Sequence, residues 1–357
     1  MTPNTSEIEN RIAGGIVGAF VGDALGLGPH WYYDLGELRR DFGEWIDGYT
    51  TPKPNARYHA GMKAGDLSQT GIIMLLLLRS LADRGTYDPA DFTRRLDEEL
   101  LPHLTGEPFA GPGGYTNHSF RQVWQARVRE HKPWGETGGN ADTSEAAERL
   151  SLLGARFALD PAAAARHAYD CCQLSQTDSL VMQQSVTFAL VMAALARGEA
   201  FDEELSDKVM DDVKDNGIPF VARSSTADVS GPESFGFASP DALFLPSWTA
   251  EVAHDPGIPI EPPWKVSLVY GMSCAVHYVL PAAYYLAARF PQDFEQAVLH
   301  AINGGGQNMS RACLAGALVG AQVGLSGIPS RFVEGLTDGE EIVRLAKRVA
   351  ADATAAS

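Results

Sequence analysis

The stretch NGGGQNMSRACLAGALVGA, residues 303–321, decides the fold. It opens with a glycine-rich turn at 303–306, a kind of backbone that can present its N–H groups to a ligand. The part at 312–321 is predicted to be a helix, and its evenly spaced small residues allow a second helix to approach closely. The stretch therefore predicts a tightly packed helix pair with a polar turn at one end.

Helical periodicity dominates the rest of the chain. The segment 8–25 is apolar and rich in glycine and alanine, which suits a helix packed closely on a neighbour. The run 70–81 is too long and too uniformly apolar for a strand and predicts a buried helix. Strand alternation is nearly absent, so the fold class is expected to be all-α. Further helices are predicted at 144–159 with a cap at Asp142 or Thr143, in two segments of 161–196 that end near Gly198, and at 278–288, 294–302 and 310–323.

Prolines gather in one region, residues 216–264. A long irregular stretch inside a compact domain is usually a lid, a binding loop or an interface element. A linker between two domains is the alternative, and it is disfavoured because the helices on both sides resemble parts of one bundle. We therefore expect a single domain over 1–357 with a Pro/Gly-rich insertion or lid at about 216–264.

Composition argues against several classes of partner. The formal net charge of -17 repels phosphate backbones, so no nucleic-acid partner is expected. No run of 18 uncharged apolar residues is present, so no membrane span is expected. The polar and acidic first ten residues lack the layout of a signal peptide, which predicts a cytoplasmic protein. A small-molecule ligand is compatible with this composition, and a homo-oligomer is left open.

The cysteines do not suggest a metal or redox site. Cys171, Cys172, Cys274 and Cys313 show no Cys-x-x-Cys spacing. Buried reduced thiols are the expected state. Cys274 and His277 lie one helical turn apart and could form a thiol nucleophile, but a structural cysteine is the favoured interpretation.

Four polar, glycine-rich segments lie beside apolar helices and are candidates for a ligand site. In the first, residues 22–34, His30 and Trp31 follow the predicted helix end. They could stack on a base or cover a sugar face, and a hydrophobic plug against a loop is an equally weighted alternative. In the second, residues 58–70, Asp66 or Ser68 would make a good N-cap. The functional alternative is that this helix presents its N-terminus to a central pocket, where its dipole favours an anion.

The third candidate combines residues 111–118 with residues 138–145, and the fourth is residues 303–311. Glycine pairs in the third let the backbone approach a ligand closely. Capping explains a polar residue at 142 or 143, but it does not explain the clustered glycines and amides. The fourth matches neither the dinucleotide fingerprint nor the phosphate-loop pattern.

Taken in order, these segments resemble the ADP-ribosylglycohydrolase family, from about residue 11 to residue 329. The resemblance rests on Gly22-Asp23-Ala24-Leu25-Gly26, on Asn303-Gly304-Gly305, on Ala315-Gly316-Ala317-Leu318 and on Gly327-Ile328-Pro329. It implies a compact multi-helix bundle around a central cleft. Members of the family usually hold two divalent metals and hydrolyse an N- or O-glycosidic bond to ADP-ribose.

Three departures from the family pattern concern the metals. A Thr-Asp-Asp motif is replaced by residues 67–69, Leu-Ser-Gln, and a Gly-Gly-Asp-x-Asp-Thr motif by residues 305–310, Gly-Gly-Gln-Asn-Met-Ser. His30 takes the place of a family glutamate. Magnesium and manganese prefer several carboxylate oxygens, so neither a binuclear metal site nor another cofactor is expected. The replacement set resembles a branch of the family related to the J-type lens crystallins.

The favoured hypothesis is a metal-independent glycosidase acting on a ribosylated or nucleoside-like small molecule. Such a reaction needs a stabilised oxocarbenium-like state and a carboxylate or an activated water. The alternatives are a catalytically silent ligand-binding or structural protein, and a lyase or isomerase of a small metabolite on the same scaffold. The candidate catalytic residues are Asp66, Asp142, Asp23 and His30, and the candidate substrate-binding residues are Trp31, Gln69, Tyr115, Asn117, His118, Asn140, Asn303, Gly305, Gly306, Gln307 and Asn308.

Overall fold

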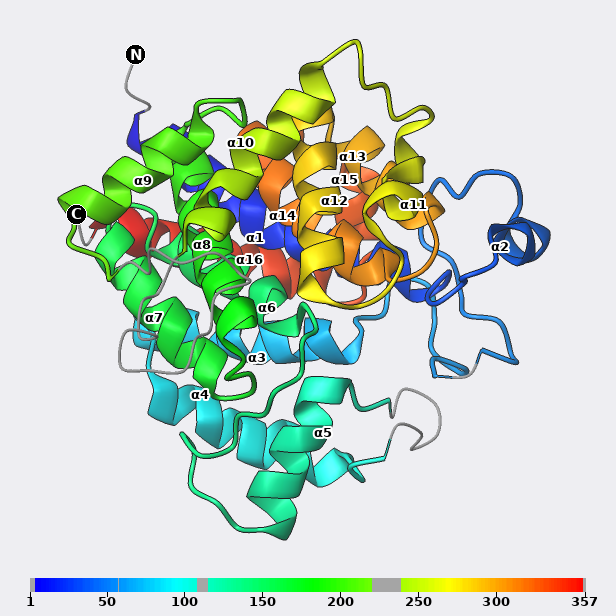
Figure 1. Cartoon of the computed structure of the whole chain (residues 1–357). Helices are drawn as coiled ribbons and strands as arrows, with labels where there is room; N and C mark the ends of the chain where they lie inside the picture. Colours follow the sequence, from blue (N-terminus) through cyan, green and yellow to red (C-terminus); the bar gives the residue numbers. More distant parts are fainter. Residues whose placement is uncertain (1–3, 57, 108–114, 220–238, 356–357) are drawn as a thin grey trace.

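A computed structural model describes residues 4–56, 58–107, 115–219 and 239–355. These residues form sixteen α-helices and no β-sheet, which confirms the predicted all-α class. The helices surround one another in a single body (Figure 1). They are α1 (Thr5–Leu27), α2 (Leu35–Phe42), α3 (Gln69–Arg84), α4 (Pro89–Arg95), α5 (His118–Trp124), α6 (Glu145–Arg156), α7 (Pro161–Gln173), α8 (Ser179–Arg197), α9 (Leu205–Asp215), α10 (Pro240–His254), α11 (Val266–Tyr270), α12 (Val276–Arg289), α13 (Phe294–Asn303), α14 (Asn308–Val323), α15 (Ser330–Glu334) and α16 (Gly339–Ala355).

Helices α1 and α14 form the central pair of the bundle. A Cβ atom placed at Gly14, Gly18 or Gly22 of α1 would overlap backbone atoms of α14 or of the turn that follows it. A Cβ at Gly316 or Gly320 would overlap α1 in the same way. Glycine is therefore required on both helices, because their backbones touch where ordinary side chains would hold them 8–10 Å apart. The predicted close approach of two small-residue helices is confirmed.

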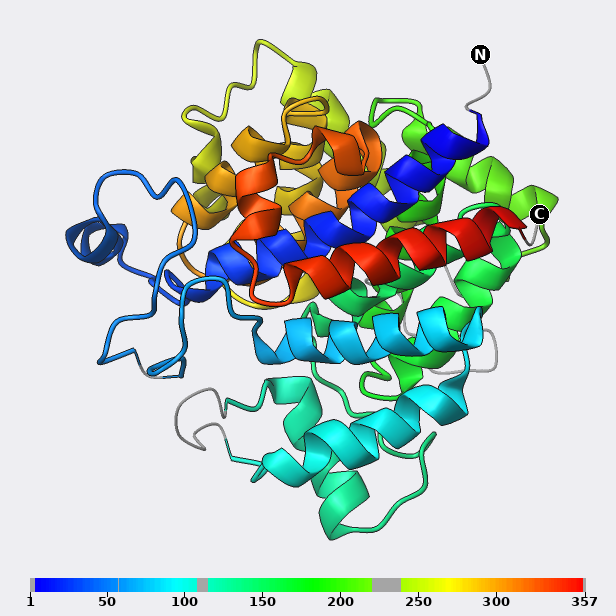
Figure 2. The ribbon, with the colours of Figure 1, turned by 180° about the vertical axis from the view of Figure 1, so that it is seen from behind.

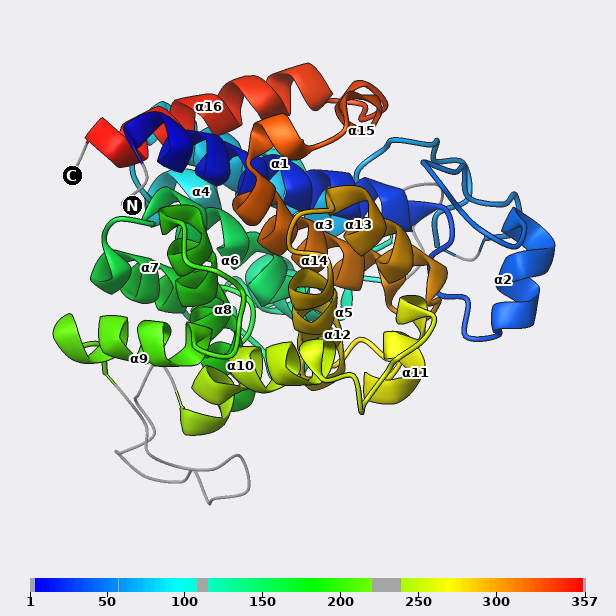
Figure 3. The ribbon, with the colours of Figure 1, turned by 90° about the horizontal axis from the view of Figure 1, so that it is seen from above.

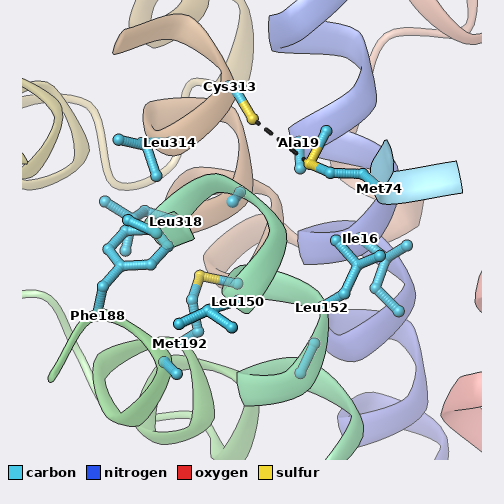
Figure 4. Close-up of a cluster of buried hydrophobic side chains, with 14 of the residues drawn as sticks. Ile16, Ala19, Met74, Leu150, Leu152, Phe188, Met192, Cys313, Leu314 and Leu318 are labelled. Atoms are coloured by element: carbon cyan, nitrogen blue, oxygen red, sulfur yellow. Dashed lines mark hydrogen bonds between the residues drawn. The ribbon is translucent and has the colours of Figure 1, made fainter. Parts of the chain in front are cut away.

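The remaining helices pack around this pair. Helix α16 runs beside α1 and α3 runs beside α16 (Figure 2), while α6 and α8 contact both helices of the pair and α12 packs on α14. The beginning of α1 lies beside the end of α16 (Figure 3), and the Thr354 hydroxyl of α16 donates a hydrogen bond of 2.7 Å to the Glu9 carboxylate of α1. Figure 4 shows side chains from α1, α3, α6, α8 and α14 meeting in one apolar core.

One segment, residues 28–68, projects from the bundle beyond the C-terminal end of α1 (Figures 1 and 3). It carries α2 and long loops, and only a few of its side chains are buried. Its base is fixed to the turn before α14: Trp31 N donates to Gly306 O at 3.3 Å and Gly306 N donates to Tyr32 O at 2.8 Å. The left-handed backbone of Gly306, φ +59°, suits a glycine and permits this reciprocal pairing.

Most predicted helices are confirmed, with ends within a few residues of those expected. Ser68 is the N-cap of α3, and Gly198 ends α8 in the left-handed conformation. The predicted cap of α6 is wrong, because α6 begins after Ser144 and the side chains at 142 and 143 do not cap it. Helix α8 is long and apolar enough to cross a bilayer by composition, yet 83% of that window is buried inside the protein.

The predicted irregular region at 216–264 is partly wrong. Its residues 240–254 form α10, which starts with a proline in the first turn and packs on α9, α12 and α8. A first-turn proline needs no N–H partner, so the proline content that argued for a loop is compatible with this helix start. Residues 220–238 and the glycines at 111–114 lie outside the described residues, so a lid function at 216–264 stays a prediction.

Candidate functional site

A pocket of about 500 Å³ lies where the projecting segment meets the bundle. The C-terminal end of α1, helix α2, the loop near residue 58 and the start of α5 contribute to its walls. Polar and apolar side chains line it in similar measure, as expected for a small-molecule site. The lining residues are Leu27, Gly28, His30, Trp31, Tyr32, Tyr33, Glu37, Asp41, Asn55, Ala56, Tyr58, His59, Tyr115, Arg121 and Cys274.

Three aromatic rings form one wall of the pocket. The Trp31 ring centroid lies 4.4 Å from that of Tyr58 and 4.9 Å from that of Tyr115, and the two tyrosine rings are 4.9 Å apart. All three pairs meet edge to face, the favourable arrangement for aromatic rings. Trp31 has a φ of +64°, uncommon for a non-glycine residue, and its indole N–H donates to Gln307 Oε1. The wall is thus held in place by a side chain at the start of α14.

Two buried imidazoles lie beside this wall. The ring centroids of His30 and His59 are 5.3 Å apart, and within the part of the chain that the structure describes the buried Nε2 atoms of both rings have no hydrogen-bond partner. Burial lowers the pKa of His59 to about 4, and burial together with the neighbouring His59 lowers that of His30 well below its usual 6.5. Both rings are therefore neutral at pH 7 and have unused hydrogen-bonding capacity at the pocket.

Charged groups lie at other parts of the lining. Asp41 Oδ2 accepts a hydrogen bond of 2.6 Å from the Tyr32 hydroxyl, and the exposed Glu37 lies one helical turn away on α2. Arg121 donates to Thr116 O at 3.3 Å and makes no ion pair within the described residues. The pocket therefore offers two carboxylates from α2 and one guanidinium from α5.

Cys274 also lines the pocket, just before α12 begins. It is partly exposed, so the prediction of a buried structural cysteine fails for this residue but holds for the other three. Burial, followed by the charge of Glu145, raises the pKa of the Cys274 thiol to about 11, so it is a neutral thiol rather than a nucleophilic thiolate at pH 7.

Several predicted substrate-binding residues instead hold the loops that form the pocket. Gln69 donates to Tyr115 O at 2.7 Å and accepts from Asn117 N at 2.9 Å. The Asn117 side chain caps α5 by accepting from Phe120 N at 2.8 Å. These contacts tie the start of α3 to the start of α5, and they place Tyr115 in the pocket wall.

His118 and Asn140 lie away from this pocket. His118 lines a separate shallow depression on α5, and Asn140 accepts a hydrogen bond of 3.0 Å from Gln122, which lines the same depression. Asn303 forms a bridge with the backbone of Ile46, accepting from its N–H at 2.9 Å and donating to its carbonyl at 2.8 Å. All three side chains therefore lie outside the pocket lining.

The three predicted catalytic aspartates do not line the pocket. Asp23 is fully buried at the N-terminus of α3, where it accepts from Ser68 N at 2.9 Å and from the Ser68 hydroxyl. Asp66 closes its own loop through Lys63 N and accepts from the Thr337 hydroxyl at 2.9 Å. Asp142 is exposed on the loop before α6. His30 is the only one of the four predicted catalytic residues in the described lining.

A second group of carboxylates is buried behind the pocket on α6. Glu145 accepts from the Thr143 hydroxyl, and Glu148 accepts from the Ser144 hydroxyl at 2.9 Å. Burial, reinforced by the charge of Glu145, raises the pKa of Glu148 to about 8. Burial likewise raises the pKa of Asp23 to about 6. Glu148 is therefore mainly a neutral acid at pH 7, and the two glutamates were not among the predicted site residues.

The residues at the expected metal positions do not fit a pair of divalent cations. Ser68 caps α3, Gln69 bonds to the backbone at residues 115 and 117, and Gln307 holds Trp31. None of these side chains is a carboxylate, and their oxygens already have partners. Within the described ranges no group of three or more His, Cys, Asp or Glu side chains is arranged to hold a metal ion. The hard oxygen ligands that Mg²⁺ and Mn²⁺ prefer are thus not provided there.

Comparison with known proteins agrees with this architecture. The family model described as ADP-ribosylglycohydrolase matches residues 4–357. A protein of Archaeoglobus fulgidus, called uncharacterized, is 24% identical over 358 residues, covering 96% of each chain. A solved structure described as an ADP-ribosylglycohydrolase-related protein complex has a TM-score of 0.61 at 18% identity, covering 98% of this chain and 99% of the other, and so shares the fold. The chain belongs to the ADP-ribosylglycohydrolase family.

Proposed function

We propose that the pocket binds a ribosylated or nucleoside-like small molecule and that the protein hydrolyses its glycosidic bond without a divalent metal. The observation that carries this proposal is the combination, in one pocket, of an aromatic wall, the unpartnered His30 Nε2 atom and the carboxylates of α2. An aromatic wall suits the flat face of a base or the apolar face of a sugar. The family relationship supports a glycosidic bond as the target.

The reaction follows from the charges at the pocket. Glycoside hydrolysis passes through an oxocarbenium-like state, whose positive charge a nearby carboxylate stabilises. Asp41 supplies that carboxylate, and the hydrogen bond from Tyr32 orients it. We assign Asp41 this role in place of the aspartates at 23, 66 and 142, which lie outside the lining.

His30 positions the attacking water. Its pKa lies well below 6.5, so the imidazole is a weak base that orients water by accepting a hydrogen bond. The water oxygen bonds to the anomeric carbon while the bond to the leaving group breaks, and the leaving group keeps the electron pair. The anomeric carbon gains OH, and the leaving group gains the remaining proton through His30.

Removing either group is expected to abolish most of the turnover. Asp41→Asn and His30→Asn should each lower kcat by about 100-fold or more, the usual contribution of a positioned acid–base group. The measurement is release of free base or ribose from ADP-ribose, adenosine and other nucleosides, in the presence of chelator. Glu44→Gln removes a carboxylate that follows α2 outside the lining and is the matched control.

Two results would contradict the proposal. Wild-type rates in both pocket variants would remove Asp41 and His30 from the mechanism. No release from any of these compounds by the wild-type protein would contradict the glycosidase and favour a silent binding or structural protein.

A further inference from the structure

The two ring nitrogens of His30 differ in their surroundings. His30 Nδ1 lies 2.9 Å from Asn308 Oδ1, at the start of α14. His30 Nε2 is buried and has no hydrogen-bond partner among the described residues, although the ring lines the pocket. The residue as a whole is only 8% exposed, so bulk water does not replace the missing partner of Nε2. An unpartnered polar atom at this depth indicates a position reserved for a ligand atom.

The orientation of Asn308 decides which nitrogen of His30 carries the proton. Asn308 Nδ2 donates a hydrogen bond of 3.2 Å to the carbonyl of Gly26, the penultimate residue of α1. A carbonyl can only accept, so the amide NH₂ must face Gly26 and the amide oxygen must face His30. That oxygen can only accept in turn, so His30 Nδ1 must be the protonated nitrogen.

The ring also remains neutral, and this leaves a lone pair on Nε2. Burial is the main cause of its lowered pKa, the neighbouring His59 imidazole lowers it further, and the buried guanidinium of Arg311 on α14 acts in the same direction. Only the hydrogen bond to Asn308 opposes them. A neutral ring protonated at Nδ1 presents an acceptor, and not a donor, at Nε2.

The residue before Asn308 acts in a parallel way. Gln307 accepts from the Trp31 indole N–H and donates to the Ser310 hydroxyl at 2.9 Å. Consecutive amides at the start of α14 thus orient the consecutive residues His30 and Trp31 at the end of α1. The pairing explains why two amides are found at the start of α14, since they fix the orientation of the two rings that line the pocket.

We propose that Asn308 is a positioning residue that fixes His30 in the Nδ1-protonated tautomer, so that the pocket binds a ligand group that donates a hydrogen bond to Nε2. A ligand hydroxyl or N–H group meets this requirement, and so does the O–H of the water that attacks during hydrolysis. An ionised carboxylate or a sulfate ion does not, because neither has a proton to donate to Nε2 at pH 7. This inference deepens the proposed function, but the tautomer itself depends only on the fold.

The tautomer is measured on the full-length wild-type protein without a ligand. In ¹⁵N-histidine-labelled protein at pH 7, two-bond ¹H–¹⁵N spectra distinguish a protonated ring nitrogen from one with a lone pair, and His30→Asn assigns the signals. The expected result is a protonated Nδ1 and an unprotonated Nε2 on His30. A protonated Nε2, or a charged ring at pH 7, would overturn the inference whether or not the protein is a glycosidase.

A positioning role for Asn308 is tested with two variants. Asn308→Ala removes the acceptor and should leave His30 as a mixture of tautomers, while Asn308→Asp keeps an acceptor at Nδ1 and should restore the wild-type tautomer. Unchanged His30 signals in Asn308→Ala would overturn the role of Asn308. If Asn308→Ala does not fold, the comparison of Asn308→Asp with the wild-type protein still tests the acceptor, because an Nε2-protonated ring in Asn308→Asp would contradict it.

The ligand class is tested in the same spectra with two probes, adenosine and inorganic sulfate. Adenosine carries hydroxyl and N–H donors and is expected to shift the His30 Nε2 signal, with at least a tenfold weaker apparent affinity in Asn308→Ala. Sulfate, which carries no proton at pH 7, is expected to leave that signal in place. A shift caused by sulfate, or adenosine binding that leaves Nε2 unchanged, would overturn the assigned ligand class and leave the tautomer result to be judged separately.

Discussion

Gly18→Ala is expected to destabilise the protein by about 3 kcal/mol or more, although alanine is the better helix former by about 1 kcal/mol. The added methyl group would overlap the carbonyl of Gly316, and that atom belongs to a backbone that is fully buried between other helices. Overpacking is costly when the neighbour cannot move, and neither helix of the central pair can shift without opening the core on its far side. Gly316→Ala is expected to have the same effect.

The measurement for these variants is chemical and thermal unfolding, with a fall in Tm of about 5 °C or more. Gly36→Ala on the exposed α2 is the matched control, because its methyl group would meet only the ends of the Asp34 and Arg40 side chains. Equal stability of the Gly18 and Gly36 variants would contradict direct backbone contact between α1 and α14.

The second large effect is the pH dependence of the stability contributed by two buried acids, Glu148 and Asp23. The folded-state pKa of Glu148 is raised from its usual 4.5 to about 8, and that of Asp23 from 3.8 to about 6, both chiefly by burial. A raised carboxyl pKa means that the folded state binds a proton which the unfolded state has already released. The stability contributed by these two acids is therefore greatest below their unfolded pKa values, falls as pH rises from about 4.5 to about 8, and loses nothing further from Glu148 above about pH 8.

Glu148→Gln isolates the larger contribution. Glutamine keeps an oxygen to accept from the Ser144 hydroxyl but carries no charge at any pH. At about 1.36 kcal/mol per pKa unit, the variant should exceed the wild-type protein by on the order of 4 kcal/mol at pH 9 and match it closely at pH 4.5. Glu251→Gln, exposed on α10, controls for removal of one negative charge. Parallel stability curves for Glu148→Gln and the wild-type protein would show that Glu148 is not buried as a neutral acid.

The sequence was sufficient to predict the central helices because the residue patterns that indicate them lie within each helix. The spacing of Gly14, Gly18 and Gly22 and the uniform apolar run at 70–81 each depend on one helix alone. The start of α10 was missed because proline in a first helical turn looks the same as proline in a loop. The sequence also singled out the segments at 22–34, 58–70 and 303–311. The structure brings residues of the first two to one pocket, while Gln307 and Asn308 of the third contact Trp31 and His30 of its lining.

The roles of individual site residues could not be predicted, because they depend on partners far away in the chain. Gln69, Gln307 and Asn308 were expected to contact a ligand. Instead, the side-chain amide of each forms a hydrogen bond with a backbone or ring atom of the protein itself. Asp41 was overlooked because α2 has no long apolar face. The pair Asp34 and Glu37 could have predicted the start of α2, since Asp34 caps that helix and the acidic Glu37 follows in its first turn.

The most direct test of the account is whether ligand binding needs a divalent cation. Thermal shifts of the wild-type protein would be measured with adenosine, ribose and ADP-ribose, each with chelator, with magnesium and with manganese. A ligand at 100 times its Kd stabilises the folded state by about 2.7 kcal/mol, which such a shift can detect. The account predicts a ligand-specific rise in Tm of equal size under all three conditions. A rise that disappears with chelator and returns with magnesium or manganese would contradict it.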